Sequence, residues 1–569
     1  MNRKFLKNVW LLTKGYWQSE ERYKATFMLV AIIAMSLAQV YVLVLFNQWY
    51  NSFYTALQEY NNEGIIWSVK EFAILAFFHV TLNSYAFYLR KVLQMNWRTW
   101  MTKQYIQDWL TARTYYLLQV FEKDTDNPDQ RISDDIRMFV ENTLSLVLGF
   151  IKNIVLFISF VGILWNLSGP LPLDFIGLNI TIPGYMVWIT LIYAIIGTWL
   201  THKTGKTLGW LNFEQQKFEA DFRYSMIRLR ENSENVAFYK GERFEGDYFG
   251  KKFTTLIDNL WKIVKKQTQV LVLTFSYSQT SVIVPLAMSV PKYLTKQINL
   301  GVFMQISSAF GRVQDSLSFF VDSYVSLAEW YSVVTRLTGF DVHMEKVKET
   351  YHQEGKYLLE GVSDKLDVKD FNILLPDGQL LIEGLNIQFT PASNWLVKGA
   401  SGTGKSTLLR AISGLWPYTN GEIFYPKGKK MFLPQKSYLP LGSLRDVLRY
   451  PGDTEISDEM IRNTLSLCKL TYLTDQLDIE DDWSVIFSLG EQQRIAFART
   501  LLHKPDWLFL DEATSAMDEQ LEQEMYSLLS DKLPSATIIS VGHRGTLNKF
   551  HAHRLSLLGD GKWKISNNI

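Results

Sequence analysis

One short stretch of the chain carries the residue types needed to hold phosphate groups. Its sequence fits the pattern G-x-x-x-x-G-K-[ST], with an apolar segment (WLVK) before it and a helical segment (STLLRAI) after it. Backbone N–H groups of such a turn close around phosphate oxygens at a helix N-terminus, where the helix dipole favours negative charge. The predicted phosphate-binding residues are Gly399, Ala400, Ser401, Gly402, Thr403, Gly404, Lys405, Ser406 and Thr407.

Two side chains of this loop, and two acids further along, are expected to do the chemistry. Lys405 would neutralise the β and γ phosphates, and Ser406 would offer its hydroxyl to Mg²⁺. The apolar run WLFL ends in Asp511 and Glu512. Asp511 would hold the Mg²⁺ side, directly or through water, while Glu512 would act as the base that polarises the attacking water. ATP and Mg²⁺ are therefore the expected ligands.

A second phosphate-binding helix start lies between these two motifs. Residues 487–494 read FSLGEQQR and open the helical run IAFARTLLH. A small, glycine-containing helix N-terminus with a hydroxyl group is suited to a phosphate. The glycine-rich loop therefore does not account for all the expected phosphate contacts.

These elements, in this order, resemble the nucleotide-binding domain of ABC ATPases. The resemblance implies that Gln435, in MFLPQKS, is the Q-loop glutamine that touches Mg²⁺ and senses the membrane domain, and that His543, after ATIISVG, is the switch histidine at the γ phosphate. It also implies a signature motif with Ser488, Gly490 and Glu491, written FSLGE instead of LSGGQ, and a D-loop, SAMD, that ends at Asp518. The aromatic residue that usually stacks on adenine is replaced here by Leu375.

The rest of the chain must position this chemistry, and its composition changes along its length. The 569 residues include 58 Lys and Arg against 57 Asp and Glu, and a net charge of +1 gives no argument for nucleic-acid binding. Long apolar blocks occur before about residue 330, and short runs with Gly and charges follow. The expected domains are an interfacial elbow helix (1–24), a transmembrane domain (25–340), a linker (341–363) and the nucleotide-binding domain (364–569).

Six apolar segments are long enough to cross a membrane, and basic residues indicate their orientation. The segment before the first span is rich in Lys and Arg, as are residues 90–137 and 202–266, whereas 48–69 and 167–200 contain neither. The six segments predict a multi-pass membrane protein, expected in a bacterial inner membrane. The positive-inside rule places both of its termini in the cytoplasm. The predicted spans are 25–47, 70–89, 145–166, 184–201, 270–290 and 299–322.

Two features of this helical part bear on transport. The two long basic segments have helical periodicity, which predicts membrane helices that continue far into the cytoplasm. The sixth span carries polar residues at spacings of three, four and seven, on one helical face, and ionisable residues at bilayer depth usually face a bundle interior or a wet cavity. This face is the candidate cargo path, although an internal ion pair that only holds helices together is the alternative: Gln305, Ser308, Arg312, Asp315 and Asp322.

The membrane part also resembles a known group. The segments NPDQRI, at 127–132, and EADFRYSMIRLRENSENVAFYKGE resemble the BacA-related and peroxisomal fatty-acyl half-transporters of ABC subfamily D, in particular their bacterial branch with a fused ATPase. The resemblance covers nearly the whole chain. It implies a six-span, exporter-like α-helical domain followed by an α/β P-loop ATPase domain, and a homodimer in which the signature motif of each chain completes the ATP site of the other.

Three functions fit these features. ATP-driven transport of a small hydrophilic solute or peptide, such as cobalamin, is favoured by the polar face of the sixth span. Movement of a lipid or fatty-acyl group is the second, and a membrane-tethered ATPase that acts on a partner without moving cargo is the third. The sequence favours neither uptake nor efflux.

Cys468, the only cysteine, is expected to be a buried apolar residue.

Overall fold

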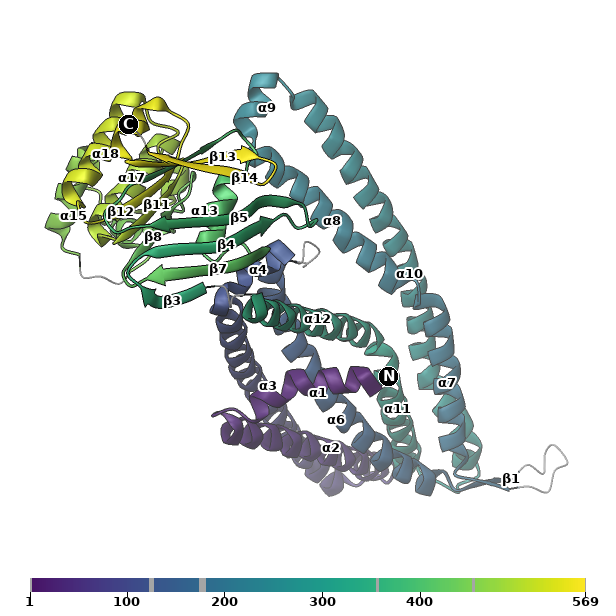
Figure 1. Cartoon of the computed structure of the whole chain (residues 1–569). Helices are drawn as coiled ribbons and strands as arrows, with labels where there is room; N and C mark the ends of the chain where they lie inside the picture. The colour runs from purple at the N-terminus through teal and green to yellow at the C-terminus, as the bar shows by residue number, and fades with distance from the viewer. Residues whose placement is uncertain (1–2, 122–126, 173–180, 355–357, 453–455, 568–569) are drawn as a thin grey trace. The chain divides into compact units, whose positions relative to one another are not determined.

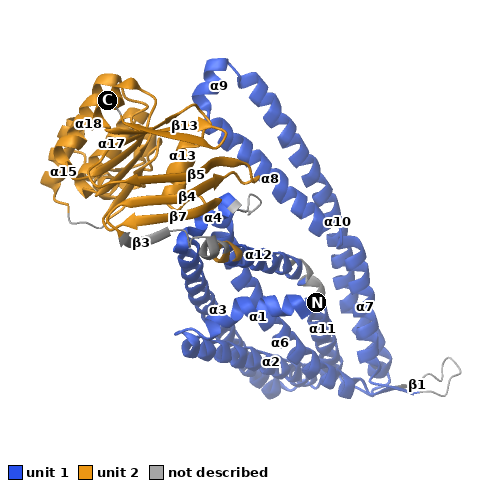
Figure 2. Cartoon of the chain, viewed as in Figure 1, with its two compact units in different colours: residues 1–345 blue, residues 346–569 orange. Residues whose placement is uncertain are grey.

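A computed structural model of the full chain describes residues 3–121, 127–172, 181–354, 358–452 and 456–567 (Figure 1). The chain divides into two compact units, residues 1–345 and 346–569 (Figure 2). Unit 1 is helical, and unit 2 contains two larger β-sheets covered by helices.

Unit 1 is built from long helices and one small β-hairpin. The hairpin pairs β1 (Pro170–Pro172) with β2 (Thr181–Pro183). The helices are α1 (Arg3–Trp17), α2 (Arg22–Gln58), α3 (Asn62–Leu110), α4 (Thr114–Phe121), α5 (Pro128–Gln130), α6 (Ile136–Ser168), α7 (Tyr185–Gly205), α8 (Leu208–Glu231), α9 (Ser233–Tyr239), α10 (Glu242–Leu294), α11 (Leu300–Asp322) and α12 (Tyr324–Glu354).

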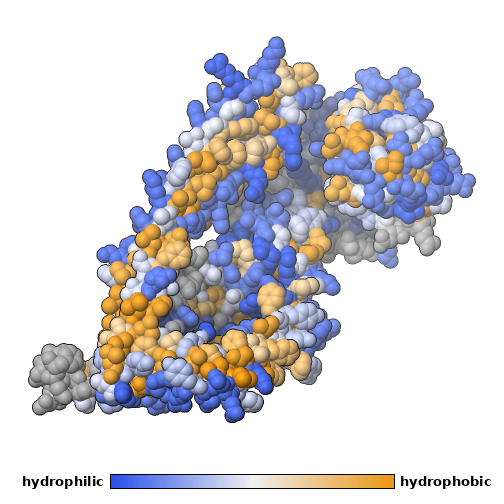
Figure 3. Space-filling model, turned by 180° about the vertical axis from the view of Figure 1, so that it is seen from behind, coloured by the Kyte–Doolittle hydropathy of each residue, from blue (hydrophilic) through white to orange (hydrophobic). Residues whose placement is uncertain are grey.

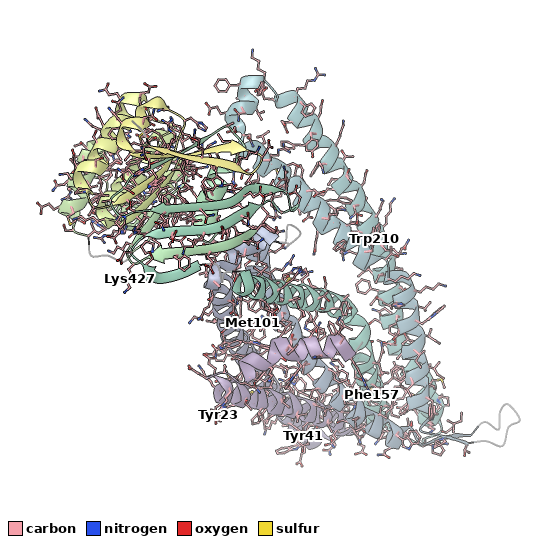
Figure 4. The ribbon with its side chains drawn as sticks, in the orientation of Figure 1. Tyr23, Tyr41, Met101, Phe157, Trp210 and Lys427 are labelled. Carbon is pink, nitrogen blue, oxygen red and sulfur yellow. The ribbon has the colours of Figure 1, made fainter. Side chains whose placement is uncertain are left out.

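Five helical segments among the described residues are long and apolar enough to span a membrane. In each of them large apolar side chains are exposed on the single chain, as expected of a surface that faces lipid: Val30, Phe77, Ile158, Ile195 and Val272. Figure 3 shows apolar side chains gathered on these helices, and Tyr23 and Tyr41 extend outward from α2 (Figure 4). The five segments are Arg22–Gln58, Asn62–Val120, Pro128–Ser168, Tyr185–Glu231 and Glu242–Leu294.

The sixth predicted span is present as the helix α11, but it is not among these five. Its polar residues, Arg312 and Asp315 among them, make it less apolar than the other five. α11 packs against α2, α6, α7 and α10, so much of its surface meets protein. A helix surrounded by other helices can carry polar residues that a lipid-facing helix could not.

The predicted extensions of the membrane helices are confirmed. α3 has 49 residues and α10 has 53, which at about 1.5 Å per residue is roughly 75–80 Å, well beyond the 30 Å of a hydrocarbon core. α8 packs along α10 (Figure 1). α1, which the sequence predicts as an elbow helix, is not isolated, because Phe5 stacks on Tyr331 of α12 and Tyr16 stacks on Trp97 of α3.

The structure differs from the expected linker at 341–363. α12 continues to Glu354, and β3 (Leu358–Ser363) already belongs to a sheet of unit 2. The reason is that the buried apolar stripe of α12 repeats at helical spacing past residue 340, through Met344 and Val347. Little irregular chain is therefore left between the end of the helix and the first strand.

Unit 2 contains a six-stranded and a four-stranded sheet. The larger has the order β14-β13-β6-β12-β11-β8, parallel except for β14, and the smaller has the order β3-β7-β4-β5. The strands are β4 (Leu366–Leu374), β5 (Leu380–Phe389), β6 (Trp395–Gly399), β7 (Thr419–Pro426), β8 (Lys430–Leu433), β11 (Trp507–Asp511), β12 (Thr537–Val541), β13 (His553–Gly559) and β14 (Lys562–Asn567).

Helices cover the larger sheet and bury its apolar strands. The principal ones are α13 (Lys405–Ile412), α15 (Asp458–Leu467), α17 (Leu489–His503) and α18 (Glu519–Lys532). Cys468, at the end of α15, is fully buried in this core, as expected, and burial raises the pKa of its thiol to about 12. It is therefore a packing residue with an unreactive thiol.

A buried polar chain joins α18 to the end of the sheet. The Tyr526 hydroxyl donates to Ser540 Oγ (3.0 Å), Ser540 Oγ donates to His551 Nε2 (2.8 Å), and His551 Nδ1 donates to the carbonyl of Leu547 (2.7 Å). Every polar atom of the imidazole is thus satisfied in the neutral form. Burial lowers the pKa of His551 to about 4.

This pKa predicts acid sensitivity of unit 2. Because the folded pKa, about 4, lies below the usual 6.5, the stabilisation is complete above pH 6.5 and is lost as the pH falls toward 4, in total about 3 kcal/mol. His551→Gln should remove most of this dependence when the unfolding of unit 2 is followed by calorimetry on the whole chain between pH 4 and 7.

Tyr526→Phe is the matched control, because it removes one hydrogen bond of the same chain but keeps the histidine. It should lower stability by about 1 kcal/mol at every pH and leave the pH dependence unchanged. An unchanged pH dependence in His551→Gln would contradict the assignment.

Candidate functional site

The carboxyl ends of four neighbouring parallel strands bring the predicted chemistry together. β6 leads into the glycine-rich loop, β11 ends at Asp511, Gln435 lies two residues after β8, and His543 two residues after β12. The four strands are adjacent in the order β6-β12-β11-β8. Ligands of open α/β sheets bind at such an edge.

The glycine-rich loop turns directly from β6 into α13. Gly404 has φ +93°, and a Cβ there would lie 2.7 Å from Leu381, so only glycine fits this position. Gly399 is equally confined, because its Cβ would lie 2.6 Å from Thr403 Oγ1 and 2.7 Å from the carbonyl of Leu557. The loop is thereby held in a tight turn at the N-terminus of α13.

The Lys405 ammonium lies over this loop. Its Nζ donates to the carbonyls of Gly399 (3.1 Å) and Ala400 (2.9 Å), and the residue is buried. Around it, Ser401 and Gly402 are exposed, while Thr403 and Thr407 are half-buried. A lysine ammonium held at a glycine-rich turn that begins a helix suits a polyphosphate.

Ser406 and Asp511 meet beside the loop. The Ser406 hydroxyl donates to Asp511 Oδ1 at 2.9 Å. Burial raises the pKa of the Asp511 carboxyl, and the Ser406 hydrogen bond opposes that rise. A hydroxyl and a partly buried carboxylate in contact are the oxygen ligands that Mg²⁺ prefers. Among the described residues no three His, Cys, Asp or Glu side chains form a metal cluster, so such an ion would take its other ligands from water or phosphate.

Glu512 lies at the centre of a second group of side chains. Gln435 Nε2 donates to Glu512 Oε2 at 3.2 Å, and His543 Nε2 donates to Glu512 Oε1 at 3.1 Å. Both carboxylate oxygens are therefore oriented by side chains from neighbouring strand ends.

The backbone of Glu512 is itself unusual, with φ +49° in the left-handed region. Its N–H still donates to the carbonyl of Val541 at 3.1 Å, so the chain leaves the ladder of β11 and β12 only after this residue. A non-glycine residue in this conformation costs about 1–2 kcal/mol and is typical of functional sites. Because of this turn, the Glu512 side chain leaves the backbone in a different direction from a side chain in a continuing strand.

The signature segment starts α17 with a complete capping box. Ser488 Oγ donates to Glu491 Oε2 (2.7 Å), as does the Ser488 N–H (2.9 Å), and the hydroxyl accepts from the Glu491 N–H. Tyr472 also donates to Glu491. Burial would raise the pKa of Glu491, but the hydrogen bonds from Tyr472 and Ser488 and the nearby Arg494 charge hold it below its usual range. A Cβ on Gly490 would lie 3.1 Å from the carbonyl of Ala516, which keeps the helix start close to the D-loop.

Asp518 caps a helix. Its side chain accepts from the Leu521 N–H at 2.7 Å, at the start of α18.

Leu375 lies in a turn after β4, where its N–H donates to the carbonyl of Gln379 and its carbonyl accepts from the N–H of Gly378. The adjacent carbonyl, of Leu374, accepts from the indole of Trp416 at 2.9 Å, so an aromatic ring does lie next to this turn.

Sequence reasoning missed Gln493, a fully buried residue of α17. Its Nε2 donates to the carbonyl of Gln435 and to Ser515 Oγ, both at 3.1 Å, and its Oε1 accepts from the Ala516 N–H at 3.0 Å. One amide therefore connects the signature helix, the Q-loop and the D-loop. The available signal was the pair of glutamines in SLGEQQR, since an uncharged amide on a buried helix face needs partners.

In unit 1, the residues of the candidate cargo path differ in burial along α11. Gln305 is buried, and its backbone carbonyl accepts from Asn47 Nδ2 at 2.9 Å. Ser308 and Arg312 are half-buried and Asp315 is exposed, with 4.0 Å between the charged groups of Arg312 and Asp315. The side chain of Asp322 lies outside the described residues. The polar face is therefore packed near Gln305 and open near Asp315.

Comparisons with known proteins agree with this arrangement. Residues 12–294 match the model of the ABC transporter transmembrane region 2, and residues 382–515 match that of the ABC transporter. An uncharacterised ABC transporter ATP-binding protein of Haemophilus influenzae is 38% identical over 98% of this chain and 93% of its own length. The chloroplastic ABC transporter D family member 2 of Arabidopsis thaliana is 32% identical over 96% of this chain and 86% of its own.

Two further matches are more distant. The human lysosomal cobalamin transporter ABCD4 is 27% identical over 96% of this chain and 93% of its own length. A solved bacterial Atm1-family ABC exporter with ATP bound has a TM-score of 0.74, 16% identity, and covers 95% of this chain and 96% of its own, which shows the fold.

A helical membrane unit joined to a sheet that gathers a phosphate loop and an oriented carboxylate defines an ATP-hydrolysing membrane transporter. The chain belongs to the ABC transporters, as a half-transporter with relatives in the D family and with its ATPase domain fused behind the membrane region. It is an integral membrane protein that binds ATP and couples its hydrolysis to transport.

The bonds of Gln493 predict a loss of turnover beyond a loss of stability. Gln493→Leu leaves buried partners on the Q-loop and D-loop unsatisfied, at about 1–3 kcal/mol, and should lower ATP turnover at least tenfold with little change in nucleotide affinity. Gln492→Leu is the control, because Gln492 is equally buried but bonds only Ser484 and Phe487. Equal loss of turnover in both variants, measured by phosphate release, would contradict the role of Gln493.

Proposed function

We propose that this half-transporter moves a small hydrophilic solute or peptide across the membrane as a homodimer. The observation that carries this proposal is the series of polar and charged side chains along one face of α11, which is buried at Gln305, half-buried at Arg312 and exposed at Asp315. Ionisable residues on a membrane helix usually face a bundle interior or a wet path. A human relative transports cobalamin, which is a hydrophilic solute of this kind.

In this proposal the residues around the strand ends divide the work of hydrolysis. Lys405 and the amides of the glycine-rich loop hold the phosphates, and Ser406, Asp511 and Gln435 would hold Mg²⁺, which would neutralise phosphate charge. Glu512 receives a proton from the attacking water, and its two hydrogen bonds aim its carboxylate. His543, one of those two donors, contacts the γ phosphate.

The homodimer follows from the positions of the two phosphate-binding helix starts on one chain. Ser488 and Gly490, with Glu491 fixing the cap, act on the ATP that lies on the glycine-rich loop of the second chain, and Asp518 sets the start of α18 behind the D-loop. Two identical sites then form at a two-fold interface. The protein lies in a bacterial inner membrane, and both of its termini lie in the cytoplasm, as the distribution of Lys and Arg indicates.

The shared site predicts complementation between two inactive chains. Lys405→Ala and Ser488→Arg homodimers should hydrolyse almost no ATP, but their mixture should regain up to about a quarter of the normal rate, because half of random dimers contain one intact site. Mixing Lys405→Ala with Glu512→Gln is the control, because both changes damage the same half of each site and no activity should return. A fully active monomer isolated in detergent would contradict the shared site.

Transport itself is tested by solute flux in proteoliposomes of known orientation. ATP should drive flux of cobalamin or of a short peptide, and Glu512→Gln should retain ATP binding but lower both hydrolysis and flux by about 10²- to 10⁴-fold. Lys405→Ala should instead lose ATP binding.

The alternatives give different results in the same vesicles. ATP-driven movement of a fluorescent phospholipid or acyl chain without solute flux would support a lipid or fatty-acyl transporter. Hydrolysis without any flux would support an ATPase that acts on a partner.

A further inference from the structure

A polar pocket lies inside unit 1, between α2, α3, α6 and α11. Its volume is about 490 Å³, and its wall contains two cations, two amides and two hydroxyl groups: Arg90, Lys152, Gln39, Asn83, Ser36 and Ser145. The Phe319 ring forms part of the wall because Gly149 has no side chain there; a Cβ would lie 2.7 Å from the ring. The pocket is distinct from the α11 face that the sequence pointed to, although α11 contributes to it.

The two cations of this pocket lack acidic partners among the described residues. Lys152 Nζ donates to Gln39 Oε1 at 2.9 Å, and Gln39 Nε2 in turn donates to the carbonyl of Leu82 at 3.2 Å, which keeps the amide oxygen turned to the lysine. Arg90 lies over the Phe87 ring at 5.6 Å. Neither contact neutralises a positive charge.

The surroundings add to this positive charge. Arg90 and Arg312 both lie within electrostatic range of Lys152. Arg312 has Asp315 at 4.0 Å, whereas Lys91, next to Arg90 in sequence, is paired with Glu141 at 3.3 Å outside the pocket. Counted over the described side chains, the pocket is therefore net positive, although carboxylates are present on the same helices.

An unpaired cation in a helix bundle is unfavourable unless something compensates it, because a low-dielectric surrounding penalises a bare charge. Two such cations with neutral hydrogen-bonding groups between them form a site for an anion, since the amides and hydroxyls can donate to its oxygens. We propose that this pocket binds the acidic group, a carboxylate or a phosphate, of the molecule that the protein moves. This assignment rests on the proposed transport function and narrows its substrate class to anions.

The test measures the charge of the pocket with thiol reagents on the whole chain. Ser145→Cys is placed in a Cys468→Ser background and reconstituted in phosphatidylcholine nanodiscs, and Ser530→Cys on the exposed surface of α18 is the reference. An anionic methanethiosulfonate should react faster than a cationic one at position 145, relative to position 530. Lys152→Gln should slow the anionic and speed the cationic reagent about twofold each, because one unit charge two helical turns away, at about 10 Å, acts through a water-like medium with about 0.4 kcal/mol.

Matched variants separate charge from packing. Lys152→Arg should keep the preference for the anionic reagent. Lys70→Gln removes one positive charge from α3 at about 30 Å from Arg90 along the helix, and it should not change the preference. Equal rates of the two reagents at position 145, or a preference that survives Lys152→Gln, would overturn the proposal.

Protection experiments identify the source of the anion. Acetate or inorganic phosphate should protect position 145 where acetamide does not, which indicates a soluble anion. Protection that appears only when phosphatidylglycerol is added, and that disappears in Lys152→Gln, indicates an anionic lipid headgroup. Protection by none of these probes would also overturn the proposal.

Labelling needs no hydrolysis, so it can be repeated in the Glu512→Gln chain. Absent solute flux with an intact charge preference contradicts the transport proposal alone, whereas normal flux without the preference contradicts the pocket assignment alone.

Discussion

The chemistry of unit 2 depends on one constraint, the parallel pairing of β6, β12, β11 and β8. Because these strands run in one direction, their carboxyl ends meet at one edge, and residues far apart in sequence come within hydrogen-bond distance there. Gln435, Glu512 and His543 meet only because of this pairing. The contacts that orient Glu512 are thus consequences of strand order, and a shift in the register of β11 would separate all three at once.

The parts of the site that depend on local sequence were predictable. The turn at Gly404, the cap of α17 at Ser488 and the strand before Asp511 follow from residue types within a few positions. Gln493 was not predictable in the same way, since its three partners come from two distant loops. The same applies to Lys152, because a single lysine in an apolar run does not reveal that its neighbour across the bundle is a glutamine instead of a carboxylate. The long helices were predicted correctly because 3.6-residue periodicity extends over many turns. The structure differs at the expected linker, 341–363, because the periodicity of α12 continues into it as far as Glu354.

Unit 1 has a different physical problem, the cost of polar groups among apolar helices. Asn47 meets part of this cost by donating from Nδ2 to the backbone carbonyl of Gln305 at 2.9 Å, although the side-chain oxygens of both residues accept no hydrogen bond among the described residues. Arg90 and Lys152 have no carboxylate partner in the described part of the chain, and their charges remain available to a ligand. A bundle that only needed stability would pair or replace them, because apolar side chains of similar size are often neutral or stabilising at such positions. The hydrogen bond from Asn47 to the backbone of Gln305 joins α2 to α11, whereas the charges of Arg90 and Lys152 can recognise cargo.

A buried ion triad joins the start of α6 to α12 within unit 1. Asp135, which follows the NPDQRI segment, accepts two hydrogen bonds from Arg336 of α12, at 2.6 and 2.9 Å, and another from Arg131. Asp135 and Arg131 are almost fully buried, so removing the Asp135 carboxylate would break a buried ion pair, at about 3–5 kcal/mol. α12 then continues as an unbroken helix to Glu354, beyond the boundary of unit 1 at residue 345. The start of α6 is therefore fixed to α12 inside unit 1, and packed elements joined in this way move together instead of deforming separately.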